Sequence, residues 1–373
     1  MATSSVDQIL TVVSEPSSTA WDAFVLQHSQ GHLLQYSAWG VLKSRFGWRS
    51  QRVAILGLAP EAARNSTSKR LDDANHTILA GAQVLFRERY GVSVAYISRG
   101  PLFCGDPAVD DLLLEALARI ARRRRAIFLR LEPNMLAGDA QADQYHTWLL
   151  MHGFQLSDPI QPRSTLHLDL APPPERLFAS FSKGHRADIR KAERLGVVIR
   201  TGSDADIAAF YAIMQATSAR ANFGIHTEAY YRAAWQLFQP RSKLLLAEQD
   251  GQVVAAHLVF ADSHAGLYLY SGASDVGLKA GANHLLQWHA IQWAREQDCE
   301  TYDLWGIPDA LGRAAVAPDE AARTALETEA QADPLIGVYR FKKGFGGTTA
   351  RYLPAYDQVY LAPLYALWRR RLA

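Results

Sequence analysis

The stretch KLLLAEQDGQVVAAHLVFADSHAGLYLYSGAS, residues 243–274, decides the fold class because it contains three apolar runs of strand length. Asp250 and Gly251 separate the first two runs and are a residue pair typical of a tight hairpin turn. The pattern predicts an antiparallel meander, followed by a helix and a further strand. The predicted strands cover 243–249, 252–261, 265–274 and 301–305, and the predicted helix covers 281–298.

The first half of the chain repeats this order of elements. Two helices precede each meander, and the second pair is marked by Gly196 after a helical run and by a Ser203/Asp206 capping pair. Two copies of one α+β unit, each with the order α-α-β-β-β-α-β, therefore form the chain. In the first copy the predicted strands cover 51–59, 77–90, 92–100 and 126–132, and the predicted helices cover 21–28, 37–45 and a segment from 107.

The composition is that of a globular protein and argues against several classes. The 373 residues include 39 Lys and Arg against 37 Asp and Glu, so the bulk charge indicates no nucleic-acid partner. Cys104 and Cys299 are the only cysteines and form no CxxC, which argues against a disulfide scaffold and a zinc site. The N-terminus lacks a signal-peptide pattern and no stretch approaches about eighteen apolar residues, so we expect a cytoplasmic protein.

The element order resembles the core of the GCN5-related N-acyltransferase (GNAT) fold. Members that use acyl-CoA place its pyrophosphate at the start of the helix after the third strand, typically in a [QR]xxGx[GA] loop. Here that place reads SDVGLKAGANHLL in the second copy, where no Gln or Arg stands at the required spacing. In the first copy it reads RGPLFCGDPAVDDLL, whose acidic residues would repel a pyrophosphate. We therefore expect a donor other than a small acyl-CoA, and no cofactor or metal.

Four stretches of the sequence resemble the Fem-type aminoacyltransferases, which move amino acids from aminoacyl-tRNA to the stem peptide of peptidoglycan precursors. They are GHLLQYSAWGVLKSRFGW (31–48), SKGHRADIRKAERLGVVI (182–199), TYDLWGIPD (301–309) and VYRFKKGFGGTTARYLPAYDQV (338–359). Some members of that family carry a long helical-hairpin arm, for which this chain has no room, so it resembles the armless type. The resemblance implies two tandem GNAT-like domains.

The resemblance also implies domain boundaries. Family members return the chain to the first domain after the last motif, and ARYLPAYDQVYLAPLY (350–365) suits a strand followed by a terminal helix. We therefore expect the first domain at 1–165 with 345–373 and the second at 166–344. Linkers are predicted at 158–174, which is rich in proline, and at 308–334, which is rich in Ala, Glu and Asp.

Lys43, at the end of QYSAWGVLK, and Arg220, in MQATSAR, match the family's cations that bind the diphosphate of the precursor. A guanidinium binds phosphate oxygens through paired hydrogen bonds, so an Arg and a Lys from two domains would hold a nucleotide sugar in the cleft between them. The alternative for Lys43 is a solvated lysine at a helix end.

Lys342 in YRFKKGFGG matches the family lysine at the reacting carbonyl, where an ammonium would stabilise a tetrahedral oxyanion. We expect a strand here, on which Lys343 would point to the opposite face, and the alternative is an ordinary sheet-edge lysine. Tyr268 and Tyr270 alternate with leucines on a predicted strand, so both should face one side of the sheet. The resemblance implies that one of them lines the acceptor site, and the alternative is a core position for both.

Asp106 follows the third strand of the first domain and lies near a family carboxylate considered as a candidate base. Loop lengths differ at this place, and Asp110 and Asp111 are close in sequence, so the assignment stays open. A carboxylate would help because a lysine-type amine has a pKa of about 10.4 and must lose a proton before it attacks.

Basic segments supply a sign of nucleic acid that the bulk charge does not. Residues 180–200 carry six Lys and Arg against two acids, and residues 336–373 carry seven against one. A third run, Arg122 to Arg125, ends the first domain's helix. Each segment alone is typical of a solvated face, whereas together, with a tRNA-bound donor implied by the family, they are candidate phosphate contacts.

The leading hypothesis is a cytoplasmic, tRNA-dependent aminoacyltransferase that forms interpeptide bridges. Its expected partners are aminoacyl-tRNA, a nucleotide- or lipid-linked muropeptide and, peripherally, the inner face of the membrane, and we expect a monomer. The first alternative is an acyl-CoA-dependent N-acyltransferase of envelope or exopolysaccharide biosynthesis. The second is an RNA-binding module without chemistry, against which the joint presence of Lys43, Arg220 and Lys342 argues.

Overall fold

The chain divides into two compact units in the computed structural model, which describes residues 9–58, 76–262 and 264–370. Unit 1 comprises Met1–Gln161 and Tyr352–Ala373, and unit 2 comprises Pro162–Arg351.

The boundaries of the units differ from the expected ones by a few residues. Residues 345–351, expected in the first domain, belong to unit 2, because β13 (Thr348–Arg351) pairs with β7 (Ser164–Asp169). The pairing of β7 also brings residues 162–165 into unit 2. The chain then returns to unit 1, where β14 (Ala355–Val359) enters the sheet between β5 and β6.

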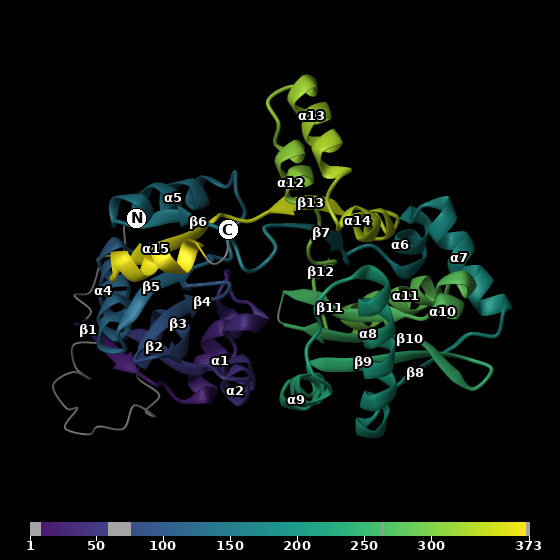
Figure 1. Ribbon diagram of the computed structural model, residues 1–373, viewed down its shortest axis with the longest axis horizontal. Helices are drawn as coiled ribbons and strands as arrows, with labels where there is room; N and C mark the ends of the chain where they lie inside the picture. The colour runs from purple at the N-terminus through teal and green to yellow at the C-terminus, as the bar shows by residue number, and fades with distance from the viewer. Residues whose placement is uncertain (1–8, 59–75, 263, 371–373) are drawn as a thin grey trace, which may run out of the picture. The chain divides into compact units, whose positions relative to one another are not determined.

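Unit 1 is built on a seven-stranded sheet in the order β1-β2-β3-β4-β5-β14-β6 (Figure 1). Neighbouring strands are antiparallel except β4 and β5, which are parallel. The predicted meander and the strand after its helix are therefore confirmed. The strands besides β14 are β1 (Ile9–Ser14), β2 (Arg49–Leu58), β3 (His76–Arg89), β4 (Val92–Ile97), β5 (Ala126–Leu131) and β6 (Gln155–Ser157).

Helices cover both faces of this sheet. The helix α4 packs on one face through Leu113 and Leu117, which are fully buried at helical spacing, and Ala95 of β4 points to the same core. The helix α15 packs on the other face, where Tyr365 joins a small cluster with Val94 of β4. The helices of unit 1 are α1 (Ser18–Gln27), α2 (Ser37–Arg45), α4 (Pro107–Arg123), α5 (Ala140–Met151) and α15 (Ala362–Arg370), with a 3-10 turn at Leu33–Gln35.

Unit 2 repeats the plan with a second seven-stranded sheet, in the order β13-β7-β12-β11-β10-β9-β8. Its one parallel pair is β11 and β12, which corresponds to β4 and β5 of unit 1. The predicted duplication is therefore present in the strand connections as well as in the element order. The strands besides β7 and β13 are β8 (Val198–Thr201), β9 (Ser242–Gln249), β10 (Gln252–Ala261), β11 (Ala265–Ala273) and β12 (Thr301–Asp303).

Two helices sandwich the centre of this sheet. Gly266 of β11 lies against α11, where a Cβ would come within 2.5 Å of Ala294, and Gly272 lies against α8, where a Cβ would come within 2.6 Å of Thr217. Within the described ranges, no helix is both long and apolar enough to cross a membrane. The helices of unit 2 are α6 (Pro174–Ser180), α7 (Lys183–Arg194), α8 (Ile207–Ala221), α9 (Glu228–Leu237), α10 (Asp275–Ala280), α11 (Ala282–Glu296), α12 (Asp309–Ala315), α13 (Glu320–Ala330) and α14 (Ile336–Lys343), with a 3-10 turn at Asp204–Asp206.

A bulge in β11 separates Tyr268 from Tyr270. Leu258 of β10 pairs with Tyr270 and Phe260 pairs with Leu267, so β11 holds one extra residue in this interval. An extra residue reverses which face the following side chains point to. Tyr268 therefore packs toward α11, beside His257, whereas Tyr270 packs toward α9 with its ring 5.0 Å from that of Tyr231. The prediction that both tyrosines face one side is wrong.

Both stretches predicted as linkers contain regular structure. Residues 158–174 include β7, which pairs with both β12 and β13 and lies between prolines that had marked a loop. Residues 308–334 include α12 and α13, which are joined by an ion pair between Arg313 and Glu329. These helices are too short to show hydrophobic periodicity, and so the sequence pattern did not reveal them.

Candidate active site

Lys342 is buried in unit 2 and lies on α14, not on a strand. The residue is 4% exposed, whereas Lys343 is exposed to solvent. The strand prediction is wrong because the chain stays helical through Lys343 and turns only at Gly346 and Gly347, both at φ +87°. Neighbouring residues of a helix point about 100° apart. Because of this angle, Lys342 points into the protein whereas Lys343 points to solvent.

Lys342 occupies the place where the two parallel strands separate. β11 and β12 pair only over residues 265–267 and 301–303. Beyond this point, Lys342 Nζ donates hydrogen bonds to the carbonyl oxygens of Gly306 at 2.7 Å and Trp305 at 3.1 Å. The ring of Tyr268 lies 5.9 Å from the same nitrogen.

Burial controls the charge of Lys342. Loss of hydration lowers the pKa of Lys342 to about 7, although the nearby Asp303 carboxylate opposes this shift. Burial alone would raise the pKa of Asp303, but hydrogen bonds from His167, Thr165 and the Trp305 amide hold it at about 2. A fixed carboxylate charge thus lies near an amine that can gain or lose its proton near neutral pH.

This pKa gives a prediction for stability. Between pH 7 and about pH 10, unfolded Lys342 binds a proton that the folded residue does not, so its contribution to the free energy of unfolding rises with pH. Replacing it with methionine removes this dependence. Relative to wild type, Lys342→Met should be more stable at pH 6 than at pH 9 by on the order of 2 kcal/mol, since each pKa unit is worth about 1.4 kcal/mol. Urea unfolding of both proteins at both pH values measures this. An equal difference at the two pH values would contradict the assigned environment.

Three polar side chains, His257, Asn283 and Tyr268, lie together on the α11 face of the sheet. His257 of β10 and Asn283 of α11 share a hydrogen bond of 2.9 Å, and the rings of His257 and Tyr268 are 5.0 Å apart. Burial lowers the pKa of His257 to about 4, so the imidazole is neutral. Sequence analysis missed His257, Asn283, His167 and Asp303, because nothing in their local spacing distinguishes them from ordinary core or surface residues.

Lys43 lies on α2 of unit 1 as a half-buried cation. Its Nζ sits over the ring of Trp39 at 4.6 Å from the centroid. Burial, and secondarily the charge of Arg87, lower the pKa of Lys43 to about 8. Arg87 of β3, which sequence analysis did not select, is exposed and lies over the ring of Trp48 at 5.6 Å. Two cations that repel each other in this way favour an anion between them.

Arg220 lies in the last turn of α8 in unit 2. Its guanidinium donates to Asp275 at 3.2 Å, and both side chains are substantially exposed. An exposed pair of this kind contributes little to stability. The arginine can therefore exchange Asp275 for a more highly charged phosphate ligand at small cost.

Asp106 has a structural function at the start of α4. Its carboxylate accepts hydrogen bonds from the main-chain amides of Ala108 and Val109, which makes it the N-cap of the helix. Asp110 is the buried member of this acidic group and accepts from Tyr145 at 2.5 Å. The structure thus accounts for both carboxylates by local hydrogen bonding.

The chain matches known protein families over most of its length. A model of the FemAB family matches residues 17–252, more than half of the chain. The chain belongs to the FemAB family. A model of an acetyltransferase (GNAT) domain also matches residues 179–343, which are nearly the whole of unit 2. This FemAB protein is therefore an acyl-transferring enzyme built on GNAT-like domains.

Curated relatives and solved structures agree with this assignment. The lipid II:glycine glycyltransferase of Staphylococcus saprophyticus subsp. saprophyticus is 23% identical, with 93% of each chain covered. That of Staphylococcus aureus (strain USA300) is 21% identical, covering 93% of this chain and 92% of the relative. The crystal structure of FemX superposes with a TM-score of 0.78 at 20% identity, covering 96% of this chain and 99% of that one. A tandem GNAT protein from the clavulanic acid biosynthesis pathway gives 0.52 at 12% identity, covering 94% and 98%.

In this FemAB chain, other protein atoms lie close to both places where a GNAT fold would bind pyrophosphate. In unit 2, Gly281 at the start of α11 faces α7 so closely that a Cβ would come within 2.5 Å of the Asp188 carbonyl. Lys191 of α7 also donates to the carbonyl of Lys279 at 2.6 Å. In unit 1, Asp106 takes the first amides of α4. Among the described residues, no group of His, Cys, Asp and Glu is arranged to hold a metal ion.

The basic segments of the FemAB chain divide into available and engaged cations. On α7, four basic side chains are exposed, Lys183, Arg190, Lys191 and Arg194, and of these Lys191 donates to the Lys279 carbonyl. Arg200, which follows them, is engaged by Glu248 and Asp206 at 2.7 Å each. In the C-terminal segment Lys342 is buried and Arg351 pairs with Asp309 at 2.8 Å. Four other cations of that segment are exposed, namely Arg340, Lys343, Arg369 and Arg370, so both segments keep candidate phosphate contacts.

Proposed function

We propose that this protein is a cytoplasmic aminoacyltransferase that moves an amino acid from aminoacyl-tRNA to the stem-peptide amine of a peptidoglycan precursor, forming interpeptide bridges. The observation that carries the proposal is the buried Lys342 at the divergence of β11 and β12, in a FemAB chain whose curated relatives are lipid II:glycine glycyltransferases. Those relatives' names favour a lipid-linked acceptor over a nucleotide-linked one.

The chemistry assigned to Lys342 follows from its position. The attacking amine forms a bond to the ester carbonyl carbon, and the carbonyl oxygen becomes negative. The bond to the tRNA ribose oxygen then breaks to leave the amide, and the departing ribose oxygen takes up the proton that the amine lost. An ammonium at Lys342 stabilises the oxyanion in a site with little water. Because its pKa is about 7, the neutral form can first accept the proton that the attacking amine loses. Tyr268 lines this site, whereas Tyr270 belongs to the opposite face.

Two features of the structure support aminoacyl-tRNA over acyl-CoA as the proposed donor. A pyrophosphate needs open main-chain amides at a helix start, and the packing of α7 against Gly281 and the capping by Asp106 leave these places filled. The exposed cations of α7 offer contacts for an RNA backbone instead.

Lys43 and Arg220 are assigned to the diphosphate of the acceptor. Removing one charged partner of a phosphate should weaken binding by about 1.5–3 kcal/mol. Titration of Lys43→Ala and Arg220→Ala with the nucleotide-linked pentapeptide precursor measures this, and both variants should fold normally because each side chain is partly exposed. Asp275→Ala is the matched control, because it frees Arg220 and should bind as well as wild type or better. If Lys43→Ala and Arg220→Ala both bound the precursor as tightly as wild type does, the proposed diphosphate site would be wrong.

The proposed function is tested by the product. Purified protein is incubated with total charged tRNA and a lipid-linked muropeptide. The stem peptide is then cleaved from the precursor, and its mass is measured by mass spectrometry. The proposal expects a mass increase of one aminoacyl residue or more. An unchanged stem peptide with active substrates would refute it.

A further inference from the structure

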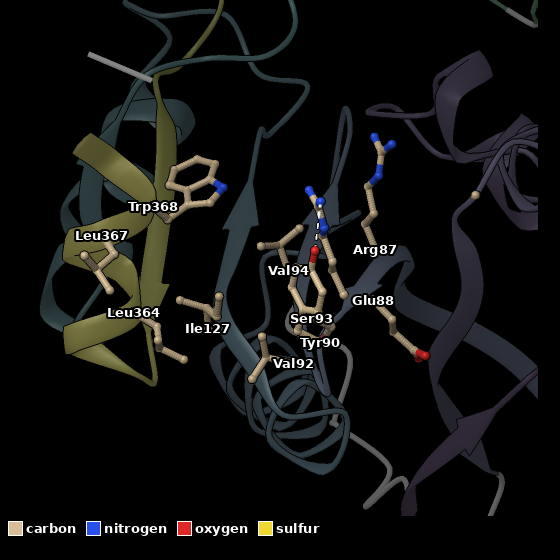
Figure 2. A pocket seen from close by; sticks show the side chains of 12 residues that line it. Arg87, Glu88, Tyr90, Val92, Ser93, Val94, Ile127, Leu364, Leu367 and Trp368 are labelled. Atoms are coloured by element: carbon tan, nitrogen blue, oxygen red, sulfur yellow. Dashed lines mark hydrogen bonds between the residues drawn. The ribbon is translucent and has the colours of Figure 1, made fainter. Parts of the chain in front are cut away.

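An apolar groove of about 850 Å³ opens on unit 1 between the β3–β4 hairpin and α15 (Figure 2). Its walls come from Val92 and Val94 of β4, Ile127 of β5, and Leu364 and Leu367 of α15. This is the face of the sheet opposite α4, so the groove is separate from the main core of unit 1. Its described lining residues all belong to unit 1, whereas Lys342 belongs to unit 2.

Large apolar side chains project from the rim of the groove. Leu364 is 38% exposed and Leu367 is 56% exposed, although α15 buries Tyr365 between them. Tyr90, at the tip of the hairpin, is 88% exposed. It also has a φ of +52°, a left-handed conformation that normally selects Gly, Asn or Asp. An aromatic residue at this turn gains little from the fold, which suggests a binding role for the ring.

Positive charge lies on the β3 wall of the groove and at the end of the helix that forms the other wall. Arg87 and Arg89 line the groove from β3, and Arg369 and Arg370 end α15. Glu88 is the only carboxylate among the lining residues that the structure describes, and it is already paired with Arg49 at 3.7 Å and Arg124 at 3.4 Å. Apolar side chains with arginines beside them are complementary to an anionic lipid surface, in which acyl chains lie beneath negative headgroups.

We propose that the groove and its rim, formed by the β3–β4 hairpin and α15, dock this protein on an anionic lipid bilayer. Leu364, Leu367 and Tyr90 enter the headgroup region, where aromatic rings are favoured, and the arginines contact the headgroup phosphates. The choice of a membrane over a protein partner rests on the proposed function, because a lipid-linked acceptor lies at a membrane surface. Arg87, which lines the groove, also lies near Lys43, the residue proposed to bind the diphosphate of the acceptor.

The test is co-sedimentation of the full chain with vesicles that contain no acceptor. Vesicles of phosphatidylglycerol and phosphatidylcholine should bind the protein, and vesicles of phosphatidylcholine alone should bind it at least about tenfold more weakly. Arg369→Ala/Arg370→Ala and Leu364→Ser/Leu367→Ser should each lower binding about tenfold or more, since one basic residue near an anionic surface is worth roughly fivefold.

Two matched controls lie in the same unit. Arg119→Ala/Arg123→Ala removes two exposed charges from α4 on the opposite face, and Leu150→Ser/Met151→Ser removes two exposed apolar side chains from α5. Both should bind vesicles as wild type does. Equal loss in the control and test variants, or equal binding to charged and neutral vesicles, would overturn the proposal. The proposal would also be overturned if the wild-type protein did not bind vesicles and Arg369→Ala/Arg370→Ala lost affinity for tRNA instead.

The experiment separates this inference from the proposed function. Vesicle binding without aminoacyl transfer would leave the docking surface in place and refute the function. Transfer to a soluble, nucleotide-linked acceptor without vesicle binding would support the function and refute the docking surface.

Discussion

Lys342→Met should lower turnover about a hundredfold or more, with little change in substrate affinity. In the proposed mechanism the ammonium interacts mainly with the charge that develops on the carbonyl oxygen, so its loss should raise the barrier and leave ground-state binding nearly intact. Removing one oxyanion donor typically costs a factor of about 10²–10³ in turnover. Steady-state kinetics with saturating acceptor measures the effect, and circular dichroism confirms that the variant is folded.

Lys343→Met is the internal control for this substitution. Lys343 is the next residue of α14 and is exposed, so its loss should leave turnover unchanged and at most weaken tRNA binding at low salt. If Lys343→Met abolished turnover while Lys342→Met remained active, the oxyanion would be stabilised by Lys343 and our assignment to Lys342 would be wrong. If both variants were fully active, the role would lie elsewhere in the site.

Asp357→Ala should lower the free energy of unfolding by about 3–5 kcal/mol, the largest stability effect we expect. Asp357 lies on β14, is fully buried, and accepts two hydrogen bonds of 2.7 Å from Arg130 of β5. Ser157 of β6 and Tyr365 of α15 each donate to it at 2.8 Å. Removing the carboxylate leaves the buried guanidinium without its counter-ion, with only the Asp158 carbonyl and the Ser157 hydroxyl as acceptors among the residues described, where β14 joins the sheet of unit 1. Urea denaturation of both proteins measures the loss.

An exposed ion pair provides the comparison. Asp204 pairs with Arg232 at the surface of unit 2, where both side chains are partly exposed. Asp204→Ala should therefore cost less than about 1 kcal/mol. A loss of similar size in the two variants would show that the Arg130–Asp357 pair does not anchor β14.

The two units differ at the place where their parallel strands end. In unit 2, Lys342 occupies the divergence of β11 and β12. In unit 1, the corresponding place after β5 is occupied by Glu132, which accepts from the Tyr96 hydroxyl and from the Gln161 amide at 3.2 Å. Gly100 further bridges to Glu132 through its main chain. Hydrogen bonds within unit 1 thus close the equivalent position, which is consistent with the chemistry residing in unit 2.

Most of the fold could be predicted from the sequence, because each element is decided by local periodicity. The strands 51–59 and 77–90, for example, appear within two residues as β2 and β3. The exceptions have local causes. The prolines around β7 predicted a loop, and α12 and α13 are too short to show periodicity. A single extra residue in β11 turns Tyr270 to the other face of the sheet, which the alternation of residue types does not predict.

The candidate site was less accessible to sequence reasoning. The family motif selected Lys342, but its buried environment is formed by distant parts of the chain. The carbonyls of Trp305 and Gly306, which accept its hydrogen bonds, lie about 36 residues away in sequence. The carboxylate of Asp303, which lies beside Lys342, is likewise defined by partners on β7. Such long-range polar contacts leave no mark on local spacing.

The most direct test of the central claim is a choice between donors. Purified protein is given a lipid-linked muropeptide with either a panel of tRNAs charged with radiolabelled amino acids or radiolabelled acetyl-CoA, and Lys342→Met is run in parallel. Our account predicts label in the muropeptide from at least one aminoacyl-tRNA, none from acetyl-CoA, and about a hundredfold slower transfer by Lys342→Met. Label from acetyl-CoA and from no aminoacyl-tRNA would contradict it.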